Sequence, residues 1–261
     1  MKTSKEAGSP ALSAQLANRV AIVTGAGRGI GAAIARQLAA DGANTVVNYF
    51  SSAPEAEGVT AAINDAGGVA VAVKADVSDP DQIAGLFEAA EKAFGTVALL
   101  VNNAGARGDS TPAAQVDAAS YEKIFGTNVR GPALCMAEFA RRVGPGGGRI
   151  VNITSGQART PMPHSSLYAG TKGALESLTR GFAADLGPSG ITVNAVAPGA
   201  TGTDVFKSEV PAAVQAQTIQ ATALGRLGTP EDIAAVVAFL LSDAAQWVTG
   251  QVIDVNGGLR R

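Results

Sequence analysis

The chain has 261 residues, of which 46% are hydrophobic and 16% charged, with a formal net charge of −2 at pH 7. This length can hold one large α/β domain or two small ones, each with a full core. A nucleic-acid-binding surface is not expected, because phosphate binding needs clustered Lys and Arg, whereas basic residues are adjacent here only at 141–142 and 260–261.

The compartment and the N-terminus can also be predicted. No apolar run approaches the roughly 20 residues of a membrane-spanning helix. Residues 1–17 contain Pro10 and no continuous apolar core, which predicts a flexible N-terminal extension and not a secretory signal. The single cysteine, Cys135, excludes an internal disulfide and lies in an apolar helical stretch, so a packed thiol is favoured over a catalytic one. We expect a soluble cytoplasmic protein.

Short β-branched runs alternate with helical patterns from residue 19 onward. The expected strands are 20–24, 44–49, 69–77, 97–103, 149–154, 191–197 and 251–255. Most are apolar on both faces, as in a parallel sheet covered by helices on both sides. In the helical segment 31–42, Ile34, Ala35 and Leu38 form a stripe with helical period, and Gly42 is its expected stop. The segment 79–95 has Asp79 as a cap and Gly95 as its end. We predict an α/β fold: a single Rossmann-like doubly wound domain over residues 18–261, with a seven-stranded parallel sheet.

A glycine-rich turn joins the first strand to the first helix, in the segment "VTGAGRGIGAAIA" (23–35). Gly25 permits a tight turn, and Gly29 and Gly31 let the backbone approach a pyrophosphate at the helix N-terminus. The strict G-x-G-x-x-G pattern fails because Ile30 occupies its last position, and T-G-x-x-x-G-x-G matches instead. A purely structural glycine hinge is the alternative.

Cofactor choice is predicted from the end of the second strand. A carboxylate there commonly binds the ribose 2′-hydroxyl of NAD, but no Asp or Glu lies between Gly42 and Pro54. Asn48 and Ser51 are neutral hydrogen-bonding residues, and Arg28 in the glycine turn can bind a 2′-phosphate. We therefore expect NADP(H) to be preferred over NAD(H), the alternative being that Arg28 only lies on the surface.

Tyr168 and Lys172 stand four residues apart in "LYAGTKGAL", and so share one helix face. A neighbouring ammonium is expected to lower the pKa of the phenol, which would then exchange protons with an alcohol or alkoxide. Such a pair alone also occurs by chance on a helix surface. Ser155 strengthens the prediction, because it follows a predicted strand at the sheet edge where its hydroxyl can bind a substrate carbonyl.

These motifs together resemble the short-chain dehydrogenase/reductase family over residues 17–258. The resemblance is carried by the following positions in order: Thr24, Gly25, Gly29, Gly31, Asp76, "NNAG" (102–105), Asn128, Ser155, Tyr168, Lys172 and "PGATGT" (198–203). It implies an NAD(P)-dependent enzyme that acts on CH–OH or C=O groups, with no metal in the catalytic step. Ketone reductases and 3-oxoacyl-(acyl-carrier-protein) reductases are the members that the chain resembles.

The resemblance also implies site roles. Tyr168 would be the general acid/base, Lys172 would lower its pKa and bind the nicotinamide ribose, and Ser155 would polarise the carbonyl. Asn128 would hold a water that links Lys172 to solvent. The expected cofactor contacts, including those argued above, are Gly25, Arg28, Gly29, Ile30, Gly31, Asn48, Ser51, Asp76, Val77, Asn102, Ala104, Gly105, Tyr168, Lys172, Pro198, Gly199, Thr201 and Thr203.

The resemblance leaves the substrate open. The resemblance implies a substrate pocket built from about residues 201–224 and from the loops near 105–112 and 156–164. Residues 201–224, with Phe206, Val210 and Ile219, are expected to form a mobile amphipathic lid over an apolar pocket. We favour NADPH-dependent ketone reduction over an acyl-carrier-protein reductase, because Leu134 and Ser189 occupy two positions where the latter tend to carry basic residues. A non-catalytic NADP(H) sensor is a weaker alternative, as is a role for His164 at the pocket rim. A homotetramer is expected through the helices bearing Asn128 and Tyr168 and through the last strand.

Overall fold

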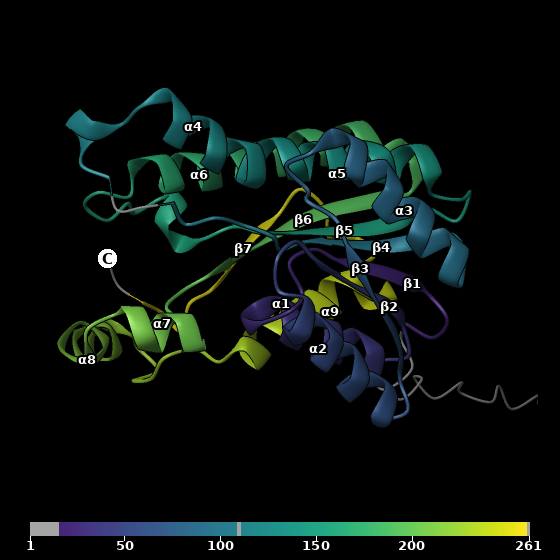
Figure 1. Ribbon diagram of the computed structural model, residues 1–261, viewed down its shortest axis with the longest axis horizontal. Helices are drawn as coiled ribbons and strands as arrows, with labels where there is room; N and C mark the ends of the chain where they lie inside the picture. Colours follow the sequence, from purple (N-terminus) through teal and green to yellow (C-terminus); the bar gives the residue numbers. More distant parts are fainter. Residues whose placement is uncertain (1–15, 109–110, 260–261) are drawn as a thin grey trace, which may run out of the picture.

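The computed structural model describes residues 16–108 and 111–259. A seven-stranded, wholly parallel sheet runs through it in the order β3-β2-β1-β4-β5-β6-β7 (Figure 1). The strands are β1 (Val20–Val23), β2 (Asn44–Tyr49), β3 (Val69–Lys74), β4 (Val97–Asn102), β5 (Gly148–Ile153), β6 (Ile191–Pro198) and β7 (Val252–Val255). The predicted doubly wound α/β fold is confirmed.

Helices cover both faces of the sheet. They are α1 (Gly29–Ala40), α2 (Ala53–Asp65), α3 (Pro80–Phe94), α4 (Ala118–Phe125), α5 (Gly131–Arg142), α6 (Ser166–Leu186), α7 (Asp204–Glu209), α8 (Ala212–Ala221) and α9 (Pro230–Leu241). Short 3₁₀ turns are η2 (Ala113–Gln115), η4 (Gly156–Ala158), η5 (Gly187–Ser189) and η6 (Asp243–Ala245). Figure 1 shows α1, α2 and α9 on one face and α3, α5 and α6 on the other.

The alternation of side chains along a strand explains why each face has its own core. In β1, Ala21 and Val23 point into the core shared with α1 and α9, while Val20 and Ile22 point into the core shared with α3 and α5. Ile34 of α1 is fully buried, as its predicted stripe requires. Because both faces of the sheet are covered, most of its strands are apolar throughout.

The predicted strand ends lie within one residue of the observed ones except at the end of β3. β3 ends at Lys74 and not at residue 77, because its partner β2 ends at Tyr49, which pairs with Lys74, so the chain beyond has no strand to bond. The packed domain also begins before residue 18. Leu16 is only 1% exposed and its N–H donates to the Asp41 carbonyl at 3.2 Å. The rest of the predicted extension lies outside the described residues.

The helix from residue 118 to residue 142 contains one irregular turn. A π-helical turn, η3 (Gly126–Arg130), connects α4 directly to α5. Such turns insert one extra residue into an α-helix and are frequent at functional sites. Asn128 lies in this turn and is fully buried, so the irregularity sets the direction of its side chain.

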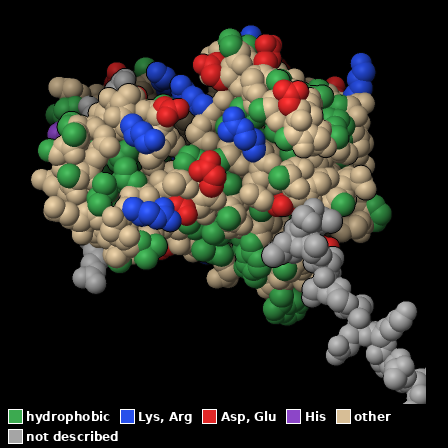
Figure 2. All heavy atoms as spheres, turned by 90° about the horizontal axis from the view of Figure 1, so that it is seen from below, with side chains coloured by type: hydrophobic (Ala, Val, Ile, Leu, Met, Phe, Trp, Pro, Cys, Tyr) green, Lys and Arg blue, Asp and Glu red, His purple; other side chains and the backbone are tan. Residues whose placement is uncertain are grey.

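The surface agrees with the mild net charge. On the face shown in Figure 2, Lys and Arg side chains are interspersed with Asp and Glu and do not form a continuous basic stripe. Within the described ranges, no helix is both long and apolar enough to cross a bilayer. Cys135 is buried, and burial raises the pKa of its thiol to about 12, which keeps it neutral and agrees with the predicted packing role.

Candidate active site

The glycine turn between β1 and α1 is held closely against the end of β4. Gly25 and Gly29 have positive φ angles of 60° and 56°. The Asn103 amide donates to the Thr24 and Gly25 carbonyls at 2.9 Å each, and the Thr24 hydroxyl accepts from the Asn103 and Ala104 N–H groups at 3.0 Å. Glycines at positions 25, 29 and 31 thereby bring the backbone of this turn, without side chains of its own there, to the N-terminus of α1, which fits a pyrophosphate group.

Gly31 offers a direct test of this packing. A Cβ atom at Gly31 would lie 2.4 Å from Asn103 Nδ2 and 2.5 Å from the Gly25 carbonyl oxygen. We therefore expect Gly31→Ala to lower the free energy of unfolding by about 1–3 kcal/mol through overpacking, and to weaken NADP⁺ binding. Urea unfolding and cofactor titration measure both quantities.

Gly58→Ala is the matched control for Gly31→Ala. Gly58 lies in α2 with nothing within 4 Å of an added Cβ. Alanine is the better helix former by about 0.8–1.0 kcal/mol, so this variant should be slightly more stable and bind cofactor normally. Normal stability and cofactor affinity in Gly31→Ala would contradict the close packing at the turn.

Asn48 corrects the sequence-based prediction, which made it a donor to the cofactor ribose. Its side chain is 1% exposed. Its Oδ1 accepts from the Gly25 N–H at 3.3 Å, and its Nδ2 donates to the Val73 and Ala75 carbonyls at 3.2 and 3.1 Å. The residue fixes the glycine turn to the end of β3 and has no donor left for a ligand.

Arg28 and Ser51 remain available at this end of the sheet. Both are exposed. Their neighbours are packed together, since a Cβ at Gly27 would lie 3.4 Å from the Ser52 carbonyl oxygen. The structure therefore brings the two polar side chains to adjoining segments at the carboxyl ends of β1 and β2, where the 2′ position of an adenosine ribose is expected.

Not all of the residues predicted to contact the adenine and the middle of the cofactor direct their side chains toward a cofactor groove. Asp76 follows β3, and its Oδ1 accepts from the Ser78 N–H at 2.8 Å. Val77 is buried in the core. Asn102 is 2% exposed and donates to Asn152 Oδ1 at 2.9 Å, so its side chain points between β4 and β5 and not into a groove. Only the backbone of Val77 and Asn102 is left for the predicted contacts.

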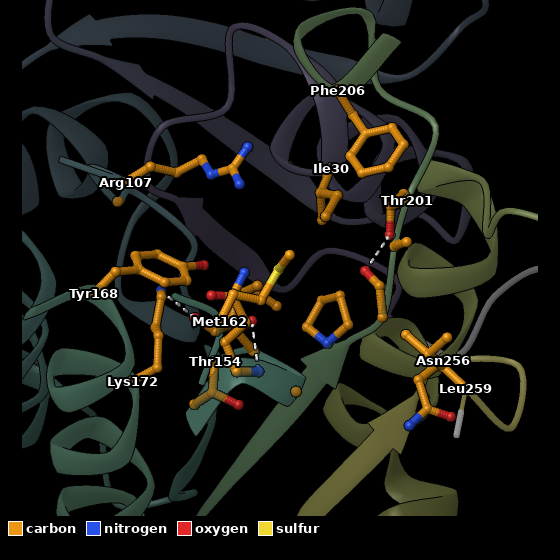
Figure 3. Close-up of a pocket in the computed structure, with 18 of the residues that line it drawn as sticks. Ile30, Arg107, Thr154, Met162, Tyr168, Lys172, Thr201, Phe206, Asn256 and Leu259 are labelled. Carbon is orange, nitrogen blue, oxygen red and sulfur yellow. Dashed lines mark hydrogen bonds between the residues drawn. The ribbon is translucent and has the colours of Figure 1, made fainter. Parts of the chain in front are cut away.

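A cavity of about 620 Å³ opens at the carboxyl ends of β5 and β6 and gathers the remaining predicted residues (Figure 3). Those lining it are Ile30, Gly105, Ser155, Tyr168, Lys172, Pro198, Gly199, Thr201 and Thr203. A Cβ at Gly29 would lie 3.4 Å from Thr203 Cγ2, so the glycine turn and the loop after β6 meet at one end of the cavity. Three catalytic candidates from two elements thus face one ligand-sized space.

Burial controls the electrostatics of the Tyr–Lys pair. Lys172 is 4% exposed, its Nζ donates to the Ile153 carbonyl at 2.8 Å, and burial lowers its pKa to about 8. Burial also raises the pKa of the Tyr168 phenol, while the Ser155 hydroxyl and the Arg107 charge act in the opposite direction. The expected lowering by Lys172 is wrong for the cofactor-free protein. Lys172 Nζ lies 5.8 Å from the Tyr168 ring centroid and is hydrogen-bonded to the backbone.

Asn128 lies beside this pair but does not line the cavity. Its Oδ1 accepts from the Ala106 N–H at 2.7 Å, and its Nδ2 donates to the Ala106 carbonyl at 2.8 Å and to the Thr171 hydroxyl at 3.0 Å. A Cβ at Gly105 would lie 3.4 Å from Asn128 Oδ1 and 3.5 Å from Lys172 Nζ. The amide therefore positions the loop after β4 against α6, and its role in a water relay stays a prediction.

The lid prediction is partly correct. Phe206 and Val210 line the cavity as expected, together with Val214 and Thr218 of α8, but Ile219 does not. None of the residues of α8 is buried, so this helix lies on the surface.

Arg107 and Met162 also line the cavity, and they lie in the loops near 105–112 and 156–164 that were expected to contribute to the substrate pocket, although neither residue was singled out. Asn256 lines the cavity as well and was given no role. The position of Arg107, two residues after the "NNAG" segment (102–105), was the available signal for that residue. His164 lines a second, much smaller pocket of about 20 Å³ beside Tyr168. Over the described part of the chain, no cluster of His, Cys, Asp and Glu could hold a metal ion.

This combination of a dinucleotide-type glycine turn with a Ser, Tyr and Lys constellation defines a nicotinamide-dependent oxidoreductase. Residues 25–260 match a family described as enoyl-(acyl carrier protein) reductase. A short-chain type dehydrogenase/reductase of Picea abies is 45% identical, covering 93% of each chain. The chain belongs to the short-chain dehydrogenase/reductase family and is an NAD(P)-dependent oxidoreductase.

Two further relatives carry information on cofactors. An Arabidopsis thaliana protein described as an NADPH-dependent aldehyde reductase-like protein, chloroplastic, is 42% identical over 93% of this chain and 94% of its own. The crystal structure of a short-chain dehydrogenase from Burkholderia cenocepacia in complex with NADP is 39% identical, with a TM-score of 0.88, covering 94% of this chain and 99% of that one.

Proposed function

We propose that the protein reduces a ketone to a secondary alcohol with NADPH, or catalyses the reverse reaction, in the cytoplasm. The observation that carries the proposal is the convergence of Ser155, Tyr168 and Lys172 on one cavity whose other end adjoins the glycine turn. An NADPH-oxidation screen over a panel of ketones tests it. The absence of turnover with every ketone, despite cofactor binding, would favour a non-catalytic NADP(H) sensor.

The residues divide the chemistry between them. When bound, the nicotinamide supplies a hydride to the carbonyl carbon. The Tyr168 hydroxyl gives its proton to the carbonyl oxygen, which forms the alcohol and leaves a phenolate. The Ser155 hydroxyl donates a hydrogen bond to the same oxygen while negative charge develops on it. In the cofactor-bound enzyme, unlike in the cofactor-free protein, the Lys172 ammonium stabilises this phenolate until a proton returns to it.

A preference for NADPH is supported by Arg28 after β1, by Ser51 after β2 and by the lack of a carboxylate between Gly42 and Pro54. We expect kcat/KM for NADPH to exceed that for NADH. Because a hydrogen bond to a charged group contributes about 1.5–3 kcal/mol, Arg28→Ala should lower kcat/KM for NADPH by roughly 10- to 100-fold and leave NADH almost unaffected. Arg36→Ala, at an exposed position of α1, is the control. Higher efficiency with NADH in the parent enzyme would overturn the preference.

A 3-oxoacyl-(acyl-carrier-protein) reductase is the alternative function. The description of the matching family, enoyl-(acyl carrier protein) reductase, also refers to a substrate on acyl carrier protein. Leu134 packs against the core and Ser189 is exposed, so neither position offers a cation to an acidic carrier. Steady-state kinetics with a β-ketoacyl thioester and with free cyclic ketones separate the two activities. Higher kcat/KM for the thioester would favour the alternative.

We also propose a homotetramer. Support comes from exposed apolar side chains near the last helix and strand, where Trp247 is 97% and Phe239 46% exposed. Such side chains are commonly covered in an assembly. Light scattering coupled to size exclusion should give four times the 26.0 kDa chain mass. A monomeric mass across micromolar concentrations would contradict the proposal.

A further inference from the structure

The charges that line the cavity do not balance. Besides Lys172, the charged side chains on its wall are Arg107, Arg159 and Asp254. Arg159 and Asp254 form a direct ion pair with each other. Among the described residues, Arg107 and Lys172 are therefore the cations of this wall without a counter-charge within the cavity, and Lys172 is already hydrogen-bonded to the Ile153 carbonyl.

Arg107 also has unused hydrogen-bonding capacity. Its nearest acidic partner among the described residues is Glu209 of α7, at 3.9 Å between Nη1 and Oε2, which is too long for a hydrogen bond. Figure 3 shows the side chain extending over the cavity above the Tyr168 ring. A guanidinium with its fork of N–H donors free matches a carboxylate, which it can bind through two parallel hydrogen bonds.

The apolar side chains of the same cavity specify the rest of the ligand. Met162, Phe206 and Val214 line the same cavity and are apolar. A ligand that satisfies this wall has an apolar or aromatic body and one anionic group. The carbonyl to be reduced has to reach Ser155 and Tyr168, so the anion and the carbonyl belong to one molecule.

Arg107 lies at the substrate end of the cavity and not at its dinucleotide end. It shares the small second pocket with Leu167, Tyr168 and His164, none of which belongs to the glycine turn. Its charge also lowers the pKa of the Tyr168 phenol, as a cation close to the proton donor would. These contacts associate Arg107 with the group that protonates the substrate.

From these observations we infer that Arg107 is a specificity-determining residue that binds the carboxylate of a keto acid with an apolar or aromatic body. The inference rests on the proposed ketone reduction and adds the substrate class. Glu209 then exchanges its distant contact with Arg107 for solvent when the acid binds, since its side chain is already 62% exposed.

The test compares isosteric acid and amide ketones. We would measure kcat/KM with NADPH for 3- and 4-acetylbenzoate and for the corresponding acetylbenzamides, in the parent enzyme and in Arg107→Gln. For whichever of the two acetylbenzoates has the higher kcat/KM, that value should exceed the kcat/KM of the corresponding acetylbenzamide by roughly tenfold or more. In Arg107→Gln the ratio of these two kcat/KM values should fall to about one. The preference should also fall as salt rises from 0.05 to 0.5 M, because the Arg107 side chain is 56% exposed.

Two sets of controls distinguish a failure of carboxylate binding by Arg107 from a failure of the proposed ketone reduction. Arg36→Gln, on the exposed face of α1, should keep the acid preference. Equal kcat/KM for acids and amides in the parent enzyme would overturn the inference while leaving ketone reduction intact. So would an Arg107→Gln variant whose main change is a raised KM for NADPH with all four ketones. Calorimetric titration of the NADP⁺-loaded enzyme with the same ligands gives a readout without turnover, where equal Kd values for acid and amide would again overturn it.

Discussion

Tyr168→Phe should lower kcat for ketone reduction by about 10²- to 10⁴-fold, the usual contribution of a positioned general acid. The substitution removes one hydroxyl and keeps the ring that lines the cavity. Since burial raises the pKa of the phenol, Tyr168 is protonated at neutral pH and ready to donate in the reduction direction. NADPH affinity, measured by fluorescence titration, should stay within about twofold of the parent value.

Tyr121→Phe is the matched control for this variant. Tyr121 lies in α4, is 43% exposed and stacks on Phe125 at 4.1 Å between ring centroids. Its hydroxyl has no part in the proposed chemistry, so turnover should not change. If Tyr168→Phe reduced ketones as fast as the parent enzyme, proton donation would have to come from another group and the mechanism would be wrong.

Lys172→Met should make the cofactor-free protein more stable while it impairs catalysis. In the fold the pKa of Lys172 is about 8, against 10.5 for an ordinary lysine, because the ammonium is desolvated. That difference corresponds to a penalty of about 3 kcal/mol on the charged form. Loss of the Nζ hydrogen bond to Ile153 costs about 1 kcal/mol in return. The variant should therefore gain about 2 kcal/mol at pH 7.

The pH dependence distinguishes this cause from better packing. Below about pH 8 both the folded and the unfolded chain hold the proton, and the parent protein carries the full penalty. Between pH 8 and 10.5 the unfolded chain holds more protons, so the stability of the parent rises with pH and the advantage of Lys172→Met disappears. Urea unfolding at pH 7, 9 and 10.5, at equal protein concentration, measures this convergence.

Lys92→Met, at an exposed position of α3, should change stability by no more than about 0.5 kcal/mol at any of these pH values. A Lys172→Met protein that is less stable than the parent at pH 7 would show that the ammonium is not an isolated buried charge.

The fold was largely predictable because strand and helix patterns alternate without ambiguity. The cap at Asp79, which accepts from the Asp81 N–H at 3.0 Å, and the positive φ of Gly42 and Gly95 are local features that the sequence specifies. The end of β3 was not predictable in the same way. It depends on where the neighbouring strand ends, which is a property of pairing and not of residues 75–77.

In the candidate site, too, some features follow from the local sequence and others depend on neighbouring strands. The four-residue spacing of Tyr168 and Lys172 predicted that both would lie on one face of a helix. The position of Ser155 after a strand predicted that it would lie at the same edge of the sheet, and all three line one cavity. The direction of the Asn48 and Asn102 side chains was not predictable, because an amide near the end of a strand can point either to the cofactor groove or to the core. The buried partners Asn152 and Ala75 that decide this belong to other strands or loops.

The π-helical turn at Gly126–Arg130 makes the placement of Asn128 depend on chain length as well as on side-chain chemistry. Each residue of an α-helix turns the chain by about 100°, so one residue more or fewer rotates everything on one side of the turn relative to the other. Relatives that keep an asparagine in their sequence but lose the extra residue would direct it elsewhere. Between residues 118 and 142, an insertion or deletion relative to another family member is therefore as informative about the position of Asn128 as the identity of the aligned residue.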